Sequence, residues 1–186
     1  MNEITIKEKI RIAIDALFSN DAWLLENDLC ERSITHKLAE YMQPLFLKYN
    51  VDCEYNGDAM REDGRKRIHM LKIELKKMGL IQKKDETTDS ELTDRLVFPD
   101  IIVHVRGKGG HAHNLCIIEV KKSTNNNSSE YDKIKLQAYT TEQHGNDLKY
   151  KIGLFIEFVT MTNDIGYNIK YFVNGIETGS ESKVVR

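Results

Sequence analysis

The sequence predicts an α/β fold in which a mixed central sheet of about five strands is flanked by helices. Apolar residues recur at helical spacing in several segments, and β-branched runs of strand length lie between and after them. Hydrophobic residues make up 40% of the chain and charged residues 30%, which is typical of a globular protein rather than a disordered one. A chain of 186 residues suits one domain with its own core, so we expect a single domain over residues 1–186.

Two amphipathic helices are expected near the N-terminus. Residues 5–18 form the first, within an N-terminal helical extension over residues 1–27. A second helix is expected from about Asp28, and it should end or kink near Met42 because Pro44 is unsuited to a helix interior. The apolar face of the first helix is predicted to contain Ile6, Ile10, Ile14, Leu17 and Phe18.

A short strand and a polar insertion follow these helices. Residues 51–55 predict the strand, which is closed by an Asn-Gly turn signal. We interpret residues 57–95 as an insertion, because this segment is polar at both ends. Helical spacing inside it predicts an exposed or edge-packed helix capped by Gly79. The apolar positions of this helix are Ile68, Leu71, Leu75 and Met78.

The β-branched runs after the insertion predict most of the sheet. Residues 96–105 and 115–122 should form an antiparallel hairpin around the glycine-containing segment 106–114. The remaining elements are expected to be a helix over residues 130–145, strands over 150–159 and 167–175, and a flexible tail over 177–186.

The hairpin brings charged residues together. If Arg106 and Leu115 are its innermost pair, Asp100 lies opposite Lys121. Asp100, Glu119 and Lys121 then share one face of the sheet, whereas the other face is wholly apolar and must be core. A slip of one residue would bury Asp100 alone on the apolar face, so the cost of burying a charge favours the convergent register.

These three side chains suit a particular chemistry. Two carboxylates with a neighbouring backbone carbonyl form a hard oxygen site for Mg²⁺ or Mn²⁺. Such a cation polarises a phosphoryl oxygen and lowers the pKa of a water, and Lys121 would orient that water or stabilise charge on the phosphorus. Hydrolysis of a phosphodiester is the predicted reaction. The alternative is a salt bridge between Glu119 and Lys121 at a strand end, a surface interaction that contributes about 0–1 kcal/mol.

The motif residues also resemble a known family. FPDIIVH (residues 98–104) followed by IIEVKK (117–122), with a helix before and a helix after, resembles the PD-(D/E)XK nuclease superfamily, the restriction-endonuclease-like phosphodiesterases. The resemblance extends over residues 31–172. It implies a restriction-endonuclease-like core and a Mg²⁺-dependent nuclease, with Mn²⁺ as a substitute and DNA as the substrate. In this resemblance Asp100 and Glu119 bind the metal with the main-chain carbonyl of Val120, and Lys121 is the catalytic lysine.

Further site residues follow from the same comparison. Many members of the family have a glutamate on the helix before the first core strand. Glu31 is the candidate for it, as a further metal ligand in this resemblance, and Glu40 is the rival. Gln137 lies where some related nucleases have a glutamine, although the tyrosine after it, Tyr139, is two positions away instead of four. Lys135 on the same helix would either touch a phosphate backbone or simply be solvated. The alternative for both glutamates is a solvated helix face.

Other potential sites are weaker. His104 lies on the same strand face as Asp100, where a supporting role is one interpretation. The three cysteines, Cys30, Cys53 and Cys116, are odd in number and widely spaced, so we expect reduced core thiols rather than disulfides or a zinc site. His111 and His113 have no acidic or thiolate neighbour in sequence and are expected to face solvent.

Composition restricts the partners. The net charge is −2, so no global field draws the chain to nucleic acid or to an anionic membrane. The best local basic patch is residues 64–67 (GRKR) with nearby lysines, which either meets a phosphate backbone or is an ordinary solvated surface. No membrane span or signal-peptide core is present in the sequence, so a cytoplasmic location is expected.

A second hypothesis for the function is a non-catalytic module that binds nucleic acid or protein. The oligomeric state is open, with a homodimer among the alternatives.

Overall fold

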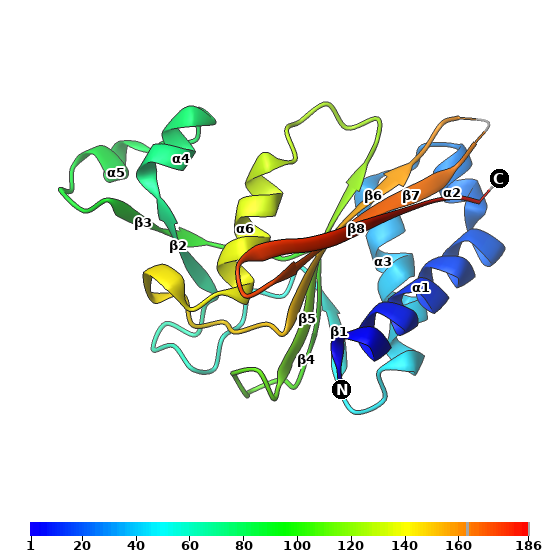
Figure 1. Cartoon of the computed structure of the whole chain (residues 1–186), viewed down its shortest axis with the longest axis horizontal. Coiled ribbons are helices and arrows are strands. Elements are labelled where there is room, and N and C mark those ends of the chain that lie inside the picture. The colour runs from blue at the N-terminus through cyan, green and yellow to red at the C-terminus, as the bar shows by residue number, and fades with distance from the viewer. Residues whose placement is uncertain (163, 186) are drawn as a thin grey trace.

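The computed structural model describes residues 1–162 and 164–185 and contains a six-stranded mixed sheet (Figure 1). β5 and β6 are parallel, and the other neighbouring strands are antiparallel. In order across the sheet, the strands are β1 (Asn50–Cys53), β4 (Ile101–His104), β5 (Asn114–Lys122), β6 (Ile152–Val159), β7 (Gly166–Val173) and β8 (Ile176–Val184). A separate two-stranded sheet consists of β2 (Arg67–Leu71) and β3 (Leu92–Leu96).

The two faces of the central sheet are covered by different elements (Figure 1). The N-terminal helices pack on one face, and the helix after β5 packs on the other together with β2. The helices and 3₁₀ turns are α1 (Glu3–Asn20), α2 (Ala22–Glu26), α3 (Glu31–Met42), η1 (Gln43–Leu45), α4 (Lys72–Lys77), α5 (Lys83–Glu86), α6 (Glu130–Thr140) and η2 (Gln143–Gly145). An α/β arrangement with a mixed central sheet is therefore confirmed.

The first two predicted helices are confirmed as α1 and α3. α1 begins after Asn2, whose Oδ1 accepts a hydrogen bond of 2.9 Å from the Thr5 amide. Its predicted apolar face is fully buried against the sheet. α3 ends at Met42, and Pro44 lies in the 3₁₀ turn that follows, as expected for a residue with no amide hydrogen to donate.

The helix predicted across Ile68 and Met78 is wrong in its first half. Residues 67–71 form β2, in which Ile68 and Met70 are buried and their neighbours are partly exposed, a period of two rather than a helical period. β2 pairs with β3 in the separate sheet, and this pairing makes residues 67–71 a strand. Within the predicted helix, only the segment of α4 is helical. It ends shortly before Gly79, whose φ of +70° is typical of a residue that follows a helix.

The flexible tail predicted over 177–186 is also wrong for its described residues. Ile176 to Val184 form β8 along the outer edge of β7, which makes six strands rather than five. The connection is a two-residue turn in which both Asn174 (φ 51°) and Gly175 (φ 79°) have positive φ. Asn-Gly is the residue pair that such a hairpin turn prefers, since both positions require left-handed backbone.

The predicted hairpin of β4 and β5 forms with a different register. Ile101 faces Ile118, so the next residues along, Asp100 and Glu119, face each other, and Asp100 is not opposite Lys121. An irregularity between Val103 and His104 accompanies the change. Because the shift is two residues as far as the pair of Val103 and Cys116, the side chains on this side of the irregularity keep their predicted faces. The apolar face of both strands is buried under the N-terminal helices, as predicted.

Two smaller expectations also change. The helix predicted to reach Gly145 ends at Thr140, and a separate 3₁₀ turn contains Gly145 and His144, the latter with φ 58°. All three cysteines are free, but only Cys116 is a core thiol. Cys30 precedes the first turn of α3 and Cys53 ends the edge strand β1, and both are exposed.

Candidate functional site

Asp100 and Glu119 meet where β4 begins. Asp100 directly precedes β4, and its Oδ2 accepts a hydrogen bond of 2.7 Å from the Val120 amide of β5. This bond ties the Asp100 side chain to the strand that contains Glu119. Two carboxylates from neighbouring strands therefore lie at one position on the sheet, on the face that α6 covers.

Glu119 is almost fully buried, at 3% exposure. Lys135 Nζ lies 2.8 Å from its Oε2, and the Tyr139 hydroxyl donates a hydrogen bond of 3.2 Å to its Oε1. Burial raises the pKa of Glu119 to about 8, and the charge of Asp100 acts in the same direction. Lys135 opposes this rise through its charge and its hydrogen bond.

Asp100 is perturbed in the same direction. Burial raises its pKa to about 6, and the nearby charges of Asp132 and Glu31 also raise it. The Val120 amide and Lys135 favour the ionised form and limit the rise. Two facing carboxyl groups with raised pKa values, beside further acidic side chains, form a region of concentrated negative charge that a cation would stabilise.

Lys121 is buried on the same face, at 7% exposure. Its Nζ lies 3.8 Å from Asp132 Oδ2, and the other Asp132 oxygen is 2.9 Å from Lys135 Nζ. The alternative in which Glu119 and Lys121 form a salt bridge is therefore wrong, since the ion-pair partner of Glu119 is Lys135. Two ammonium groups and Asp132 surround the predicted pair of carboxylates.

Glu31 lies beside Asp100, and Glu40 does not. Glu31 begins α3, and its Oε2 accepts hydrogen bonds from the Lys122 amide (3.0 Å) and from Asn125 Nδ2 (3.2 Å). Glu40, near the other end of α3, pairs with Lys37. A hollow of about 750 Å³ is lined by Glu31, Arg32, Thr35, Cys53, Glu54, Phe98 and Asp100.

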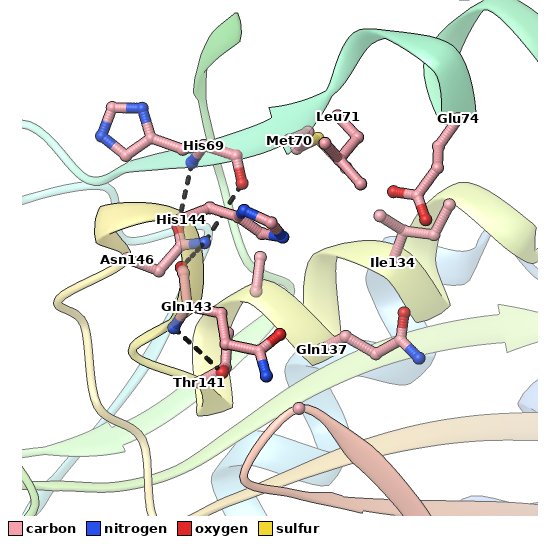
Figure 2. A pocket seen from close by; sticks show the side chains of 12 residues that line it. His69, Met70, Leu71, Glu74, Ile134, Gln137, Thr141, Gln143, His144 and Asn146 are labelled. Atoms are coloured by element: carbon pink, nitrogen blue, oxygen red, sulfur yellow. Dashed lines mark hydrogen bonds between the residues drawn. The ribbon is translucent and has the colours of Figure 1, made fainter. Parts of the chain in front are cut away.

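Gln137 and His104 lie apart from this group. Gln137 lines a different pocket, of about 210 Å³, between β2 and α6, together with Glu74 and His144 (Figure 2). His104 is 2.9 Å from Asp52 Oδ2 and its ring packs against Tyr55 at 4.8 Å between centroids. Neither side chain is placed beside Glu119, so the predicted accessory roles do not follow from the geometry.

Asp132 and Tyr139 were not among the residues predicted for the site. Both belong to α6, where Asp132, Lys135 and Tyr139 are spaced at i, i+3 and i+7. Residues at this spacing share one face of a helix. The sequence therefore contained a signal, a polar stripe on the helix that follows Glu119, whereas Gln137 lies on a different face of that helix and lines another pocket.

The donor atoms suit a hard divalent cation. Asp100 and Glu119 supply carboxylate oxygens, the ligands that Mg²⁺ and Mn²⁺ prefer, and burial raises the pKa of both carboxyl groups. Among residues 1–162 and 164–185, no three His, Cys, Asp or Glu side chains form a ready metal-binding group. Glu119 would have to exchange its contact with Lys135 for the metal.

Comparisons with known proteins assign no family. No protein-family model, curated protein or solved structure matches this chain. In the part of the chain that the structure describes, none of the helices has both the length and the apolar character needed to cross a bilayer. The resemblance to PD-(D/E)XK nucleases rests on Asp100, Glu119 and Lys121 and on the elements around them.

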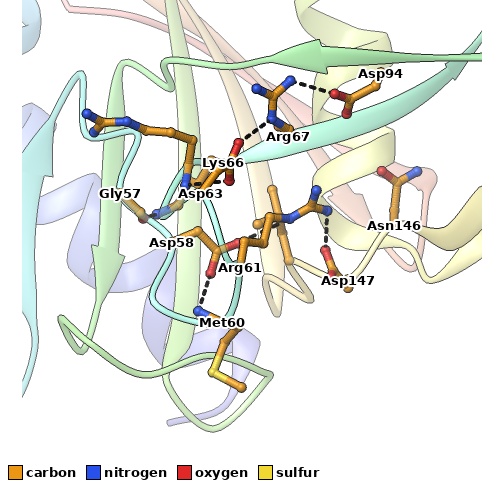
Figure 3. Close-up of polar contacts among 12 residues, drawn as sticks. Gly57, Asp58, Met60, Arg61, Asp63, Lys66, Arg67, Asp94, Asn146 and Asp147 are labelled. Carbon is orange, nitrogen blue, oxygen red and sulfur yellow. Dashed lines mark hydrogen bonds and ion pairs between the residues drawn. The ribbon is translucent and has the colours of Figure 1, made fainter.

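Two of the basic residues in the predicted patch, Lys66 and Arg67, have partners within the protein (Figure 3). Arg67 pairs with Asp63 at 2.8 Å and with Asp94 at 2.6 Å. Lys66, in contrast, is 3% exposed and donates a hydrogen bond to the Gly57 carbonyl. Burial lowers the pKa of Lys66 to about 8. Within residues 64–67, Arg67 is therefore occupied by two carboxylates and Lys66 is buried, so neither is free to meet a phosphate backbone.

Lys66→Met is expected to flatten the pH dependence of stability in the alkaline range. Because the folded-state pKa of Lys66 is about 8 and its ordinary value is 10.5, the unfolded chain binds more protons between these pH values. The free energy of unfolding of the wild type should therefore rise by up to about 3 kcal/mol from pH 8 to 10.5 relative to the variant. Urea titrations at several pH values measure this difference, and the exposed Lys76→Met is the control.

Proposed function

We propose that this protein is a Mg²⁺-dependent nuclease that hydrolyses phosphodiester bonds, with DNA as the substrate. The observation that carries the proposal is the pair of carboxyl groups, Asp100 and Glu119, which face each other on neighbouring strands and both have raised pKa values. Lys121 lies buried on the same face. DNA as the substrate, and a restriction-endonuclease-like core, rest on the resemblance to PD-(D/E)XK nucleases.

Each residue has a distinct role in this reaction. Asp100, Glu119 and the Val120 carbonyl would hold the cation, which supplies the charge that polarises the phosphate and acidifies a water. Lys121 donates a hydrogen bond to the attacking water or to a phosphate oxygen, so its ammonium opposes the negative charge that develops on phosphorus. Lys135 holds Glu119 in place until the cation binds, and Glu31 fixes the backbone after β5 through the Lys122 amide.

Cleavage assays test the proposal directly. Supercoiled plasmid, linear duplex, single-stranded DNA and RNA are incubated with the purified protein in Mg²⁺, in Mn²⁺ and in EDTA. Cleavage that requires the metal is the expected result. If none of these substrates is cut in either metal, or if EDTA leaves cleavage unchanged, the assignment as a metal-dependent nuclease is wrong.

Affinity for Mn²⁺ is expected to increase strongly with pH. Protons compete with the metal for carboxylate oxygens, so binding tightens as Glu119 and Asp100 lose theirs. With pKa values of about 8 and about 6, the dissociation constant should fall about 10²-fold between pH 6 and 8.5. Isothermal titration calorimetry at matched ionic strength measures it. A dissociation constant that does not change over this range would contradict carboxylate ligation by these residues.

A non-catalytic binding or assembly module is the second candidate. The observation in its favour is that both Glu119 oxygens already have protein partners, Lys135 and Tyr139. A closed polar network of this kind can serve a purely structural role. No Mn²⁺ binding in calorimetry, together with thermal stability that is unaffected by Mn²⁺, would favour the module over the enzyme.

A further inference from the structure

Beside Asp100, two exposed apolar side chains lie on one side of an extended segment. Leu96 is 42% exposed and Phe98 is 53% exposed, whereas the residues between and after them, Val97 and Pro99, are buried. In extended chain, alternate residues point to the same side. Leu96, Phe98 and Asp100 therefore form a row, which we call the Phe98 strip, and it leads toward the carboxylate.

The Phe98 strip is held by its backbone. The Val97 amide donates a hydrogen bond of 3.1 Å to the Lys66 carbonyl, and the Val97 side chain is buried at 2% exposure. Pro99 restricts Phe98 to extended backbone conformations, because a residue before proline is disfavoured in the helical region. The backbone that presents the Phe98 ring is therefore held on both sides, so no loop has to become ordered when a ligand packs on the ring.

The hollow next to Asp100 combines this ring with acidic groups. Phe98 is its aromatic lining residue, and Glu31, Glu54 and Asp100 supply three carboxyl groups against one guanidinium, Arg32. Arg32 is itself paired with Glu54 at 2.9 Å. Negative charge of this kind repels a bare phosphate, so the part of a nucleic acid that suits the ring is the uncharged face of a base.

We propose that Phe98 is a stacking platform for an unpaired nucleobase. The base would lie next to the phosphate that is polarised by the cation held by Asp100 and Glu119. This inference rests on the proposed function and makes it more specific: the substrate is single-stranded nucleic acid, or has an unpaired base at the reacting position. Bases in an intact duplex keep their faces stacked on each other, whereas an unpaired base exposes a face that an aromatic ring can cover.

Binding without cleavage tests this inference. Single-stranded oligonucleotides with 2-aminopurine at successive positions are titrated with wild type, Phe98→Ala and Phe98→Trp in Ca²⁺, a hard cation that carboxylates bind. We expect Phe98→Ala to weaken binding about 5- to 150-fold, because stacking of one base contributes about 1–3 kcal/mol. Fluorescence quenching at one 2-aminopurine position should be lost in Phe98→Ala and restored in Phe98→Trp, a signature that an effect on folding alone would not produce.

A matched control and a duplex separate the possible outcomes. Ile73→Ala removes a similarly exposed apolar side chain, 62% exposed on α4, and should bind as wild type does. Duplex DNA of the same sequence should be insensitive to Phe98→Ala. Wild-type affinity of Phe98→Ala for single strands, an equal loss for the duplex, or no binding of single strands by the wild type would each overturn the inference. If the wild type cleaves nucleic acid in a metal-dependent way but Phe98→Ala does not weaken binding, the inference about Phe98 is wrong and the proposed nuclease function is unaffected.

Discussion

Asp100→Asn is expected to reduce metal-dependent cleavage by about 10³-fold or more, because a neutral amide is a poorer ligand and several kcal/mol of charge stabilisation would be lost. Glu119→Gln should have an effect of similar size for the same reason. Rates of cleavage at saturating Mg²⁺ measure both variants. Asparagine has nearly the shape of aspartate, so the change removes charge at Asp100 with little change in volume.

Folding effects can be separated from this loss of activity. The Asp100 carboxyl has a raised pKa, so ionisation is disfavoured by folding, and Asp100→Asn should not lower the melting temperature. Glu40→Gln is the matched control, because Glu40 is a carboxylate on α3 that pairs with Lys37 outside the site. Equal cleavage by wild type and by Asp100→Asn or Lys121→Ala would remove the basis for the proposed reaction.

Asp85→Ala is expected to destabilise the β2–β3 unit by about 3–5 kcal/mol, the usual cost of breaking a buried ion pair by removing one partner. Asp85 and Arg95 are 3% and 6% exposed, and Arg95 donates hydrogen bonds of 2.9 and 2.5 Å to the two carboxylate oxygens. Asp85 also accepts a hydrogen bond of 2.7 Å from the Gln82 amide. Arg95 holds the pKa of Asp85 far below its ordinary value, so the ionised pair is the folded form.

Urea denaturation and hydrogen exchange of the β2 and β3 amides measure this effect. Asp94→Ala is the matched control: Asp94 is the neighbour of Arg95 on β3 and pairs with Arg67, and both side chains are about one-third exposed. Such a pair contributes about 0–1 kcal/mol. If Asp85→Ala and Asp94→Ala were equally stable, the Asp85–Arg95 pair would not be what holds the separate sheet together.

The elements that could be predicted from the sequence are those whose pattern is local. α1 and α3 followed from helical spacing, and Pro44 marked the end of α3. The faces of β4 and β5 near Asp100 followed from alternation. They were predicted correctly although the register was wrong, because the predicted register differs there by an even number of residues. Asp100 and Glu119 were consequently placed together on one face although their partner residues were assigned incorrectly.

The elements that could not be predicted depend on partners distant in sequence. β2 is a strand because β3, which begins 21 positions after the end of β2, pairs with it, and its apolar residues alone also fit a helix. β8 is exposed and polar on both faces, so no hydrophobic alternation marks it, although the Asn-Gly turn before it does. Lys135 and Tyr139 contact Glu119 because of the way α6 is oriented on the sheet, and the order of residues in α6 does not determine that orientation.

The connection from β5 through α6 to β6 implies that the candidate site assembles in two stages during folding. Lys135 and Tyr139 are 16 and 20 positions from Glu119, whereas Glu31 is 91 positions from the Lys122 amide that it binds. Contacts between near neighbours in sequence close short loops and form early; those across long separations form late. A partly folded form in which α3 has detached would keep Glu119 paired with Lys135 but would lack one wall of the hollow beside Asp100.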